Sequence, residues 1–235
     1  MFAEFLSRDE FYQKYMQLLA TRMAIGNVEM ENPEIKGNMS DHYMDIFNNM
    51  EAFRKLFDEN KDVISPYDIA DIAFRVTNEI YQGFRKTQVE VCKAKNFYPI
   101  AASAVIPKMY SIMDNYYNVW NMLSAYEKEA RLHIELVRTQ PFEDGNKRTA
   151  RILTNYNLCK QNKAPIIITG IETDKYFSYI DNYDIDGFAK YLEEKSKAEL
   201  DVMMNLYKSI CGTDSLVAEE SVPNSLVHVY KKTIW

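Results

Sequence analysis

The segment TQPFEDGNKRTAR, from Thr139 to Arg151, constrains this chain more than any other part of its sequence. It stands between two stretches of helical periodicity and combines acidic, amide and basic side chains around one glycine. Gly145 allows the backbone to turn its N–H groups toward an anion, and a helix that begins near Asn146 adds the positive end of its dipole. Asp144 can hold a divalent cation. The basic side chains are Lys147, Arg148 and Arg151. The segment therefore predicts a site for phosphate groups and a metal.

The rest of the chain is predicted to be mostly helical. Gly and Pro number only 7 each, which favours long helices over a turn-rich β architecture. Apolar residues recur at helical spacing in most segments, with Ser40 and Ser65 as N-caps and Gly83 as the end of the third helix. We expect helices over residues 8–30, 40–60, 66–83, 107–124, 125–138, 151–161, 176–183 and 187–210.

Two segments depart from helical periodicity. Residues 85–98 contain the alternating run Thr87–Val91 and end on Phe97-Tyr98-Pro99, which predicts a short β-hairpin. Pro165–Ile168 is expected to be extended. Since there is no repeat or low-complexity linker, we expect one all-α domain over residues 1–212 and a tail over 213–235.

Composition limits the classes of partner and location. The 235 residues are 47% hydrophobic and 26% charged, as in an ordinary globular protein with one core. A net charge of −6 argues against a nucleic-acid partner, because nucleic-acid binders are more often basic. The three cysteines, Cys92, Cys159 and Cys211, form no CxxC pair and predict a reducing, cytoplasmic location. Residues 1–20 do not resemble a signal peptide and no apolar run could span a bilayer, so no membrane partner is expected.

The segment from 139 to 151 closely resembles the active-site motif of the Fic family of protein adenylyltransferases, HxFx(D/E)GNxRxxR. The similarity continues in Gly83–Val89, Phe97–Pro99 and Ile106–Met109 and spans about residues 83–190. It implies a Fic-type helical bundle with N-terminal helices over residues 1–60 and a core over 83–190. It also implies that the hairpin is a flap, whose residues Thr87, Gln88 and Val89 lay a target segment across the site.

The resemblance implies ATP and Mg²⁺ as the ligands, and transfer of AMP to a Ser, Thr or Tyr hydroxyl of a target protein. On this basis Asp144 holds Mg²⁺, and the backbone around Gly145 and the side chain of Asn146 cradle the α- and β-phosphates. Arg148 and Arg151 hold the outer phosphates, and Lys147 adds charge to the nucleotide site. Pro141 and Phe142 anchor the loop. The target can include the chain itself, and a homodimer is compatible with the family.

The motif departs from the family at its first residue, because Gln140 stands where the family carries its catalytic histidine. A neutral histidine accepts the proton of the target hydroxyl, whereas an amide offers only hydrogen bonds. Loss of a general base costs on the order of 10²–10⁴ in rate. The sequence therefore predicts a chain that binds ATP–Mg²⁺ but transfers poorly. His133 lies two helical turns earlier and is expected in the core, not as a substitute base.

Two alternatives remain beside nucleotidyl transfer. Lys147 stands where the commonest motif has glycine, and Doc-type relatives, which resemble kinases, carry lysine there. These relatives have alanine at the position of Gly145, which favours AMP transfer over phosphotransfer. The other alternative is a regulatory module that binds nucleotide without chemistry, as the absence of a histidine at residue 140 would allow.

The first helix carries a candidate inhibitory motif. Many Fic proteins have the pattern (S/T)xxxE(G/N), whose glutamate pairs with the last arginine of the active-site motif. Glu31 and Asn32 fit this pattern, although Asn27 replaces Ser or Thr. A second register over Thr21–Gly26 puts Ile25 in the place of the glutamate. An ordinary acidic helix end is an equally good interpretation of the same residues.

Overall fold

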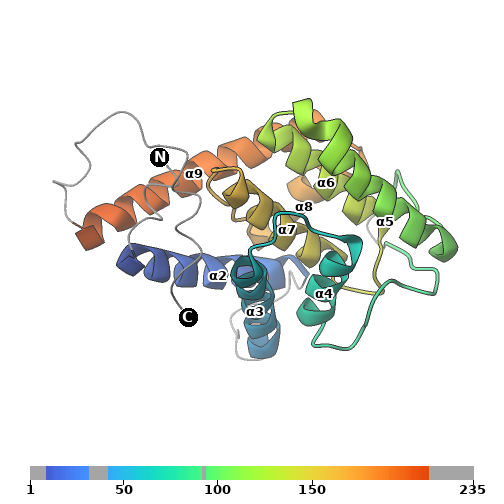
Figure 1. Ribbon diagram of the computed structural model, residues 1–235, viewed down its shortest axis with the longest axis horizontal. Coiled ribbons are helices and arrows are strands. Elements are labelled where there is room, and N and C mark those ends of the chain that lie inside the picture. Colours follow the sequence, from blue (N-terminus) through green and yellow to red (C-terminus); the bar gives the residue numbers. More distant parts are fainter. Residues whose placement is uncertain (1–8, 32–41, 92–93, 212–235) are drawn as a thin grey trace.

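The computed structural model describes residues 9–31, 42–91 and 94–211, and within these ranges it contains helices and loops but no strand (Figure 1). The all-α class is therefore confirmed for the described part of the chain. Asn32, Ser40, Cys92 and the predicted tail over 213–235 lie outside it. The α-helices are α2 (Asp9–Glu31), α3 (Tyr43–Glu59), α4 (Pro66–Val76), α5 (Val105–Asp114), α6 (Ala125–Thr139), α7 (Asn146–Lys160), α8 (Thr173–Asp181) and α9 (Ile185–Cys211).

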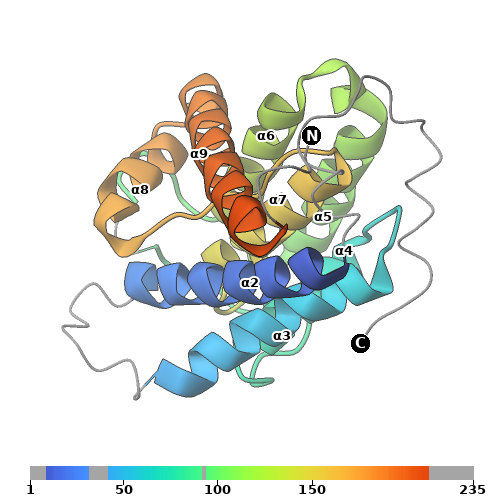
Figure 2. The same cartoon turned by 90° about the vertical axis from the view of Figure 1, so that its left-hand side faces the viewer.

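Helix α7 lies at the centre of the bundle. Nearly every residue from Thr149 to Leu158 is buried, because α3, α4 and α6 pack around it. Helix α2 lies between α9 and α3, as both views show (Figures 1 and 2). No helix in the described ranges is both long enough and apolar enough to cross a bilayer.

Capping side chains fix where two helices begin. Ser65 and Ser124 each accept a hydrogen bond from the backbone N–H three residues later, and the acidic residue at that position returns the bond. These reciprocal capping boxes start α4 and α6. The predicted starts at Ser65-Pro66 and at Ala125 are therefore confirmed.

The predicted end of the third helix at Gly83 is wrong, since α4 ends at Val76. The hydroxyl of Thr77 donates to the carbonyl of Ala73 at 2.9 Å, and Asn78 and Glu79 follow with φ of 57° and 59°. Two successive residues in the left-handed region cannot continue a right-handed helix. The chain turns here and runs beside the motif loop.

The helix predicted over residues 107–124 is also different in the structure. A 3₁₀ turn, η2 (Ala102–Ala104), leads into α5 at Val105, so the helical path begins earlier than Pro107. After α5 the path widens into a π-helical turn, η3 (Asn115–Val119), and tightens into a second 3₁₀ turn, η4 (Trp120–Met122). The remaining 3₁₀ turn, η5 (Gly170–Glu172), directly precedes α8.

The predicted β-hairpin over residues 85–98 is wrong for the residues that the structure describes, because they form no strand. Side chains bind backbone carbonyls in and just after this segment. Arg85 donates to the carbonyls of Thr87 and Ile100, and the amide of Gln88 donates to the carbonyl of Pro99 at 3.2 Å. The described residues of the flap (residues 85–98), 85–91 and 94–98, are therefore irregular segments tied together by side chains.

Candidate functional site

The motif forms a tight loop between two helix ends. Gln140 ends α6 with φ of 48° and ψ of 63°, and Gly145 precedes α7 with φ of 79°. Both residues are in the left-handed region, which reverses the chain at each end of the loop. The first-turn N–H groups of α7 have no carbonyl partners within the helix and point into the site. The predicted helix start near Asn146 is confirmed, whereas the helix expected over 151–161 from apolar spacing begins at Asn146 instead of Arg151.

Asn146 closes this loop on itself. Its Oδ1 accepts from the N–H of Phe142 at 2.9 Å, and its Nδ2 donates to the carbonyl of Phe142 and to Oε1 of Gln140, both at 2.9 Å. The side chain is 8% exposed. In this structure the amide therefore holds the loop in shape, whereas a direct contact of Asn146 with phosphate stays a prediction.

Apolar contacts fix the loop to the core. Phe142 is buried and stacks on Phe84 with ring centroids 5.9 Å apart, and Phe84 in turn meets the ring of Tyr67 at 5.4 Å. Pro141 is also buried. These contacts match the anchoring role that the family resemblance implies for Pro141 and Phe142.

Gly145 has no space for a side chain. A Cβ added there would lie 2.9 Å from methyl groups of both Thr77 and Val76, and its positive φ disfavours other residues independently. The turn that ends α4 thus packs directly against the last residue of the motif loop. An alanine at this position would require that turn to move.

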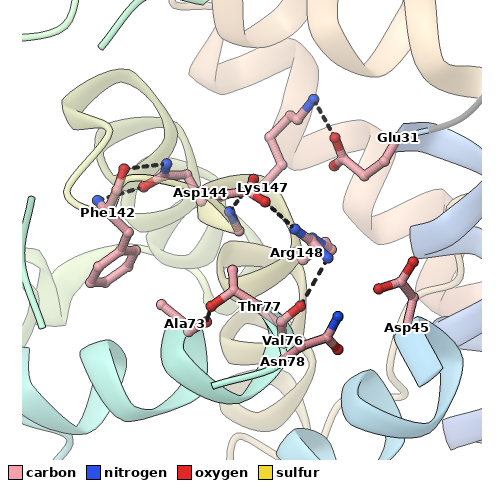
Figure 3. Close-up of polar contacts among 12 residues, drawn as sticks. Glu31, Asp45, Ala73, Val76, Thr77, Asn78, Phe142, Asp144, Lys147 and Arg148 are labelled. Carbon is pink, nitrogen blue, oxygen red and sulfur yellow. Dashed lines mark hydrogen bonds and ion pairs between the residues drawn. The ribbon is translucent and has the colours of Figure 1, made fainter. Parts of the chain in front are cut away.

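Arg148 and Asp144 form the outer side of the loop (Figure 3). Arg148 donates to the carbonyl of Val76 at 2.9 Å and pairs with the carboxylate of Asp144 at 2.9 Å. The Asp144 side chain is 58% exposed, whereas that of Arg148 is 11% exposed. No group of three or more His, Cys, Asp or Glu residues gathers for a metal within the described ranges. Asp144 is therefore a single exposed carboxylate, a donor that suits a Mg²⁺ held mainly by substrate phosphates and water.

Arg151 lies deeper, where α7 meets the end of α2. Its side chain is 3% exposed, its Nε donates to Oδ1 of Asn27, and its Nη2 lies 3.4 Å from Oε1 of Glu31. The guanidinium also lies over the ring of Tyr176, 5.5 Å from the centroid. Asn27 is held by a bond from its Nδ2 to Oδ1 of Asn49 at 2.9 Å.

Glu31 binds a second cation. Its Oε2 lies 3.0 Å from Nζ of Lys147, a contact that Figure 3 shows across the gap between α7 and α2. Burial alone would raise the pKa of the Glu31 carboxyl, but Arg151 and Lys147 together hold that pKa below its ordinary value. The carboxylate is therefore charged near neutral pH and sits between two motif cations.

Of the two registers proposed for the inhibitory motif, the structure brings the one over Asn27–Glu31 to Arg151. In the other register, the Thr21 hydroxyl donates to the carbonyl of Gln17 within α2, at 2.8 Å. Close packing fixes the helix here, since a Cβ on Gly26 would lie 2.3 Å from the carbonyl oxygen of Ile168.

The loop keeps unused donors that suit an anion. Nε of Arg148, Nη1 of Arg151 and the hydroxyl of Thr149 are buried and have no hydrogen-bond partner among the described residues. Buried polar groups in native proteins are almost always paired, so these three groups on one helix are donors that an anion could use. Their positions in the first turns of α7 fit a phosphate-bearing ligand.

Gln140 is bound on both sides of its amide. Its Nε2 donates to the carbonyl of Val137 at 2.6 Å, and its Oε1 accepts from Asn146. His133 takes no part in this hydrogen-bond network. It is fully buried, with Nδ1 2.9 Å from the hydroxyl of Thr154 and Nε2 2.7 Å from that of Tyr176. Burial, and then the charge of Arg151, lower the pKa of His133 to about 3. The predicted core location of His133 is confirmed.

The flap residues lie beside the loop. Thr87 and Gln88 are exposed and Val89 is half-buried. The carboxylate of Glu143 accepts from the Thr87 hydroxyl at 2.8 Å and from the N–H of Lys86 at 3.2 Å. Neither Glu143 nor Arg85 was expected from the sequence to join flap and loop, because an isolated acid or base in a loop carries no periodic signal.

The comparisons with known proteins agree with this geometry. The sequence model of the Fic/DOC family matches residues 63–158. Protein adenylyltransferase Fic of Aedes aegypti is 29% identical over 231 residues, which cover 92% of this chain and 43% of the relative. Protein adenylyltransferase fic-1 of Caenorhabditis elegans is 29% identical over 181 residues, covering 71% of this chain and 35% of the relative. The chain thus spans less than half the length of these curated relatives.

Solved structures share the fold. A Fic domain containing signaling protein from Bacteroides thetaiotaomicron superposes with a TM-score of 0.74 at 18% identity, covering 86% of this chain and 92% of that one. A fragment of Fic-1 from C. elegans gives 0.71 at 19% identity, covering 86% of this chain and 67% of that one. Residues 63–158 thus match the Fic/DOC family model, and the bundle has the fold of solved Fic-domain structures.

Proposed function

We propose that this chain carries a Fic-type nucleotidyltransferase site that binds ATP with Mg²⁺. The site is built to transfer AMP to a Ser, Thr or Tyr hydroxyl of a target protein. The observation that carries the proposal is the set of unpartnered buried donors on Arg148, Thr149 and Arg151 at the start of α7. The names of the relatives, protein adenylyltransferases, support the same reaction.

In this reaction the target hydroxyl oxygen would attack the α-phosphorus of ATP. The bond between the α-phosphorus and the oxygen that bridges to the β-phosphate would break, and pyrophosphate would leave. Arg148 and Arg151 would stabilise charge on the outer phosphates, and the N–H groups around Gly145 would face the α- and β-phosphates. A Mg²⁺ ion held by Asp144 would neutralise part of the phosphate charge when bound.

The hydroxyl proton has no acceptor at residue 140. The Nε2 group of Gln140 only donates, and its Oε1 is occupied by Asn146. An amide oxygen is also far too weak a base to take a proton near neutral pH. We therefore propose that the chain binds nucleotide but transfers AMP slowly.

Replacement of Gln140 by histidine tests this role. In Gln140→His we expect transfer of label from [α-³²P]ATP to protein to rise about 10²–10⁴-fold, because a base returns to the site. The binding of ATP, measured by calorimetry with Mg²⁺ present, should change little. An unchanged transfer rate in a variant that still binds ATP would refute the role assigned to residue 140.

We also propose that Glu31 acts as a brake. Its carboxylate lies between Lys147 and Arg151, and Arg151 is one of the two arginines assigned to the outer phosphates, so Glu31 and a phosphate compete for the same cation. This proposal uses Asn27 in the position where the family pattern has Ser or Thr. In this proposal Lys147 pairs with Glu31 before ATP binds and with the nucleotide afterwards.

A regulatory module without chemistry is the second candidate function. The observation that favours it is the full engagement of the Gln140 amide, which stabilises the loop in place of a base. Nucleotide binding without labelling, before and after Gln140→His, would support it. Phosphotransfer of the Doc type would label protein from [γ-³²P]ATP but not from [α-³²P]ATP. The lack of space at Gly145, where Doc-type relatives have alanine, argues against phosphotransfer.

The proposal extends to the target, the location and the oligomeric state of the chain. The target is a protein that offers a hydroxyl near the flap, and the chain itself is one such protein. The scattered cysteines favour the cytoplasm. A homodimer remains compatible with the proposal and is testable by light scattering.

A further inference from the structure

Arg85 connects the flap to the motif loop through the most extensive set of contacts in this region. Arg85 is 3% exposed. Its Nε donates to the carbonyl of Gln140 at 2.6 Å, its Nη1 donates to the carbonyl of Thr87 at 2.8 Å, and its Nη2 donates to the carbonyl of Ile100. Its backbone N–H donates to the carbonyl of Pro141 at 2.9 Å. Arg85 therefore holds the first two residues of the motif together with two segments, residues 86–91 of the flap and residues 94–100, which end the flap and continue to Ile100. We call these two segments the flap arms.

The partners of this guanidinium are neutral carbonyls. Burial lowers the pKa of Arg85, and the charge of Glu143 only partly opposes that effect. A buried cation without a paired carboxylate is an unfavourable way to gain stability. The planar fork of an arginine can, however, hold three carbonyls in one fixed arrangement, which a flexible amine cannot do. The contacts thus favour a role in geometry over a role in stability.

The backbone at Gln140 is arranged for this contact. Its left-handed conformation, with φ of 48°, turns the carbonyl away from α6, and the carbonyl meets Nε of Arg85. Residue 140 is where the proposed reaction needs its base, and Thr87 lies on the arm that faces the target. The same side chain therefore touches the backbone at both places.

We propose that Arg85 is a positioning residue that fixes the target-binding flap relative to residue 140. It sets how far a hydroxyl laid along the flap lies from the group that takes its proton. The inference rests on the proposed transfer reaction for its functional consequence, but the mechanical link between flap and motif stands on the contacts alone. Arg85 contacts neither the proposed phosphate donors nor Asp144, so we expect its replacement to change nucleotide binding much less than transfer.

The test uses Arg85→Lys in the Gln140→His background, with the chain itself as acceptor and [α-³²P]ATP as donor. Lysine keeps the charge but loses the fork. A displacement of reacting groups by about 1 Å can cost about 10²-fold in rate, so we expect the maximal labelling rate to fall about 10- to 100-fold. The ATP concentration at half-maximal rate should stay the same. Arg75→Lys is the control, because the Arg75 side chain donates to Asp71 on the same helix and not to the flap or to residue 140.

A parallel measurement separates this inference from the proposed function. In the chain with Gln140 retained, Arg85→Lys should speed amide hydrogen exchange in both flap arms and in residues 139–142 together, with α9 unchanged. If Gln140→His gives no labelling, the transfer proposal fails while the exchange result still decides whether Arg85 is the link. Three results would overturn the inference. They are unchanged exchange, an undiminished labelling rate, and a fall in labelling that is explained by a higher ATP concentration at half-maximal rate.

A milder variant covers the case in which Arg85→Lys does not fold. Glu143→Gln weakens the bonds to Lys86 and Thr87 but leaves Arg85 on the carbonyls of Gln140 and Ile100. Exchange should then rise in the arm 86–91 and not in the arm 94–100. An equal rise in both arms would mean that Arg85 does not hold them, and would overturn the inference.

Discussion

Removal of the Glu31 charge is the sharpest perturbation of the proposed brake. The Glu31 side chain is 27% exposed and its carboxylate lies 3.0 Å from Lys147 and 3.4 Å from Arg151. A hydrogen bond to a charged group contributes about 1.5–3 kcal/mol, and an ion pair that is partly exposed contributes less than about 1 kcal/mol. An outer phosphate that displaces Glu31 must overcome about 2–3 kcal/mol, most of it at Arg151.

In Glu31→Gln the shape of the side chain stays and its charge is lost. Since 1.4 kcal/mol corresponds to a tenfold change in affinity, about 2–3 kcal/mol predicts that ATP binds about 30- to 140-fold more tightly. AMP has no outer phosphates, and its affinity should stay the same. Calorimetry with ATP and AMP, in Mg²⁺ at pH 7, measures both; Glu31 is charged at this pH because its pKa is lowered.

Glu29→Gln is the matched control for this experiment. Glu29 lies on the same helix, but its carboxylate accepts from the N–H of Gly170 at 3.1 Å and does not contact the motif cations. It should leave ATP affinity unchanged. Equal affinities for ATP in the parent chain and in Glu31→Gln would refute the competition, and so would an equal gain for ATP and AMP. Glu31 would then be an ordinary acidic helix end.

Two further variants test the loop and the core. Gly145→Ala should destabilise the chain by about 1–2 kcal/mol from its positive φ alone and by more from the clash with Thr77, and should weaken ATP binding. Gly83→Ala has a similar φ of 76° but open space, so in thermal unfolding it should show only the smaller loss, and equal losses would contradict the clash. Burial raises the pKa of the fully buried Glu129 to about 7, so folding stability should fall by up to about 3 kcal/mol as pH rises from 4.5 through 7. Glu129→Gln should flatten that part of the profile in urea unfolding from pH 4 to 8, and an unaltered slope would show that Glu129 is not its source.

Local signals in the sequence were sufficient for much of the fold and the loop. Serine caps with an acidic residue three positions later set the starts of α4 and α6, and Gly145 set the turn before α7. These signals act within a few residues of each other, so they are legible in a linear sequence. The motif residues that the sequence singled out do lie together at the start of α7.

Contacts between distant residues were decided only by packing. Arg151 meets Asn27 across 124 positions and Arg85 meets Gln140 across 55, and neither pairing has a local pattern. The same reason applies to two of the errors in the fold: Thr77 ends α4 by turning beside the motif loop, and Arg85 binds the carbonyls of Thr87 and Ile100 where a hairpin was expected. The sequence by itself determined which groups could bind an anion. The tertiary structure decided that Lys147 and Arg151 are already held by Glu31, because only the packing of α2 beside α7 brings that carboxylate to them.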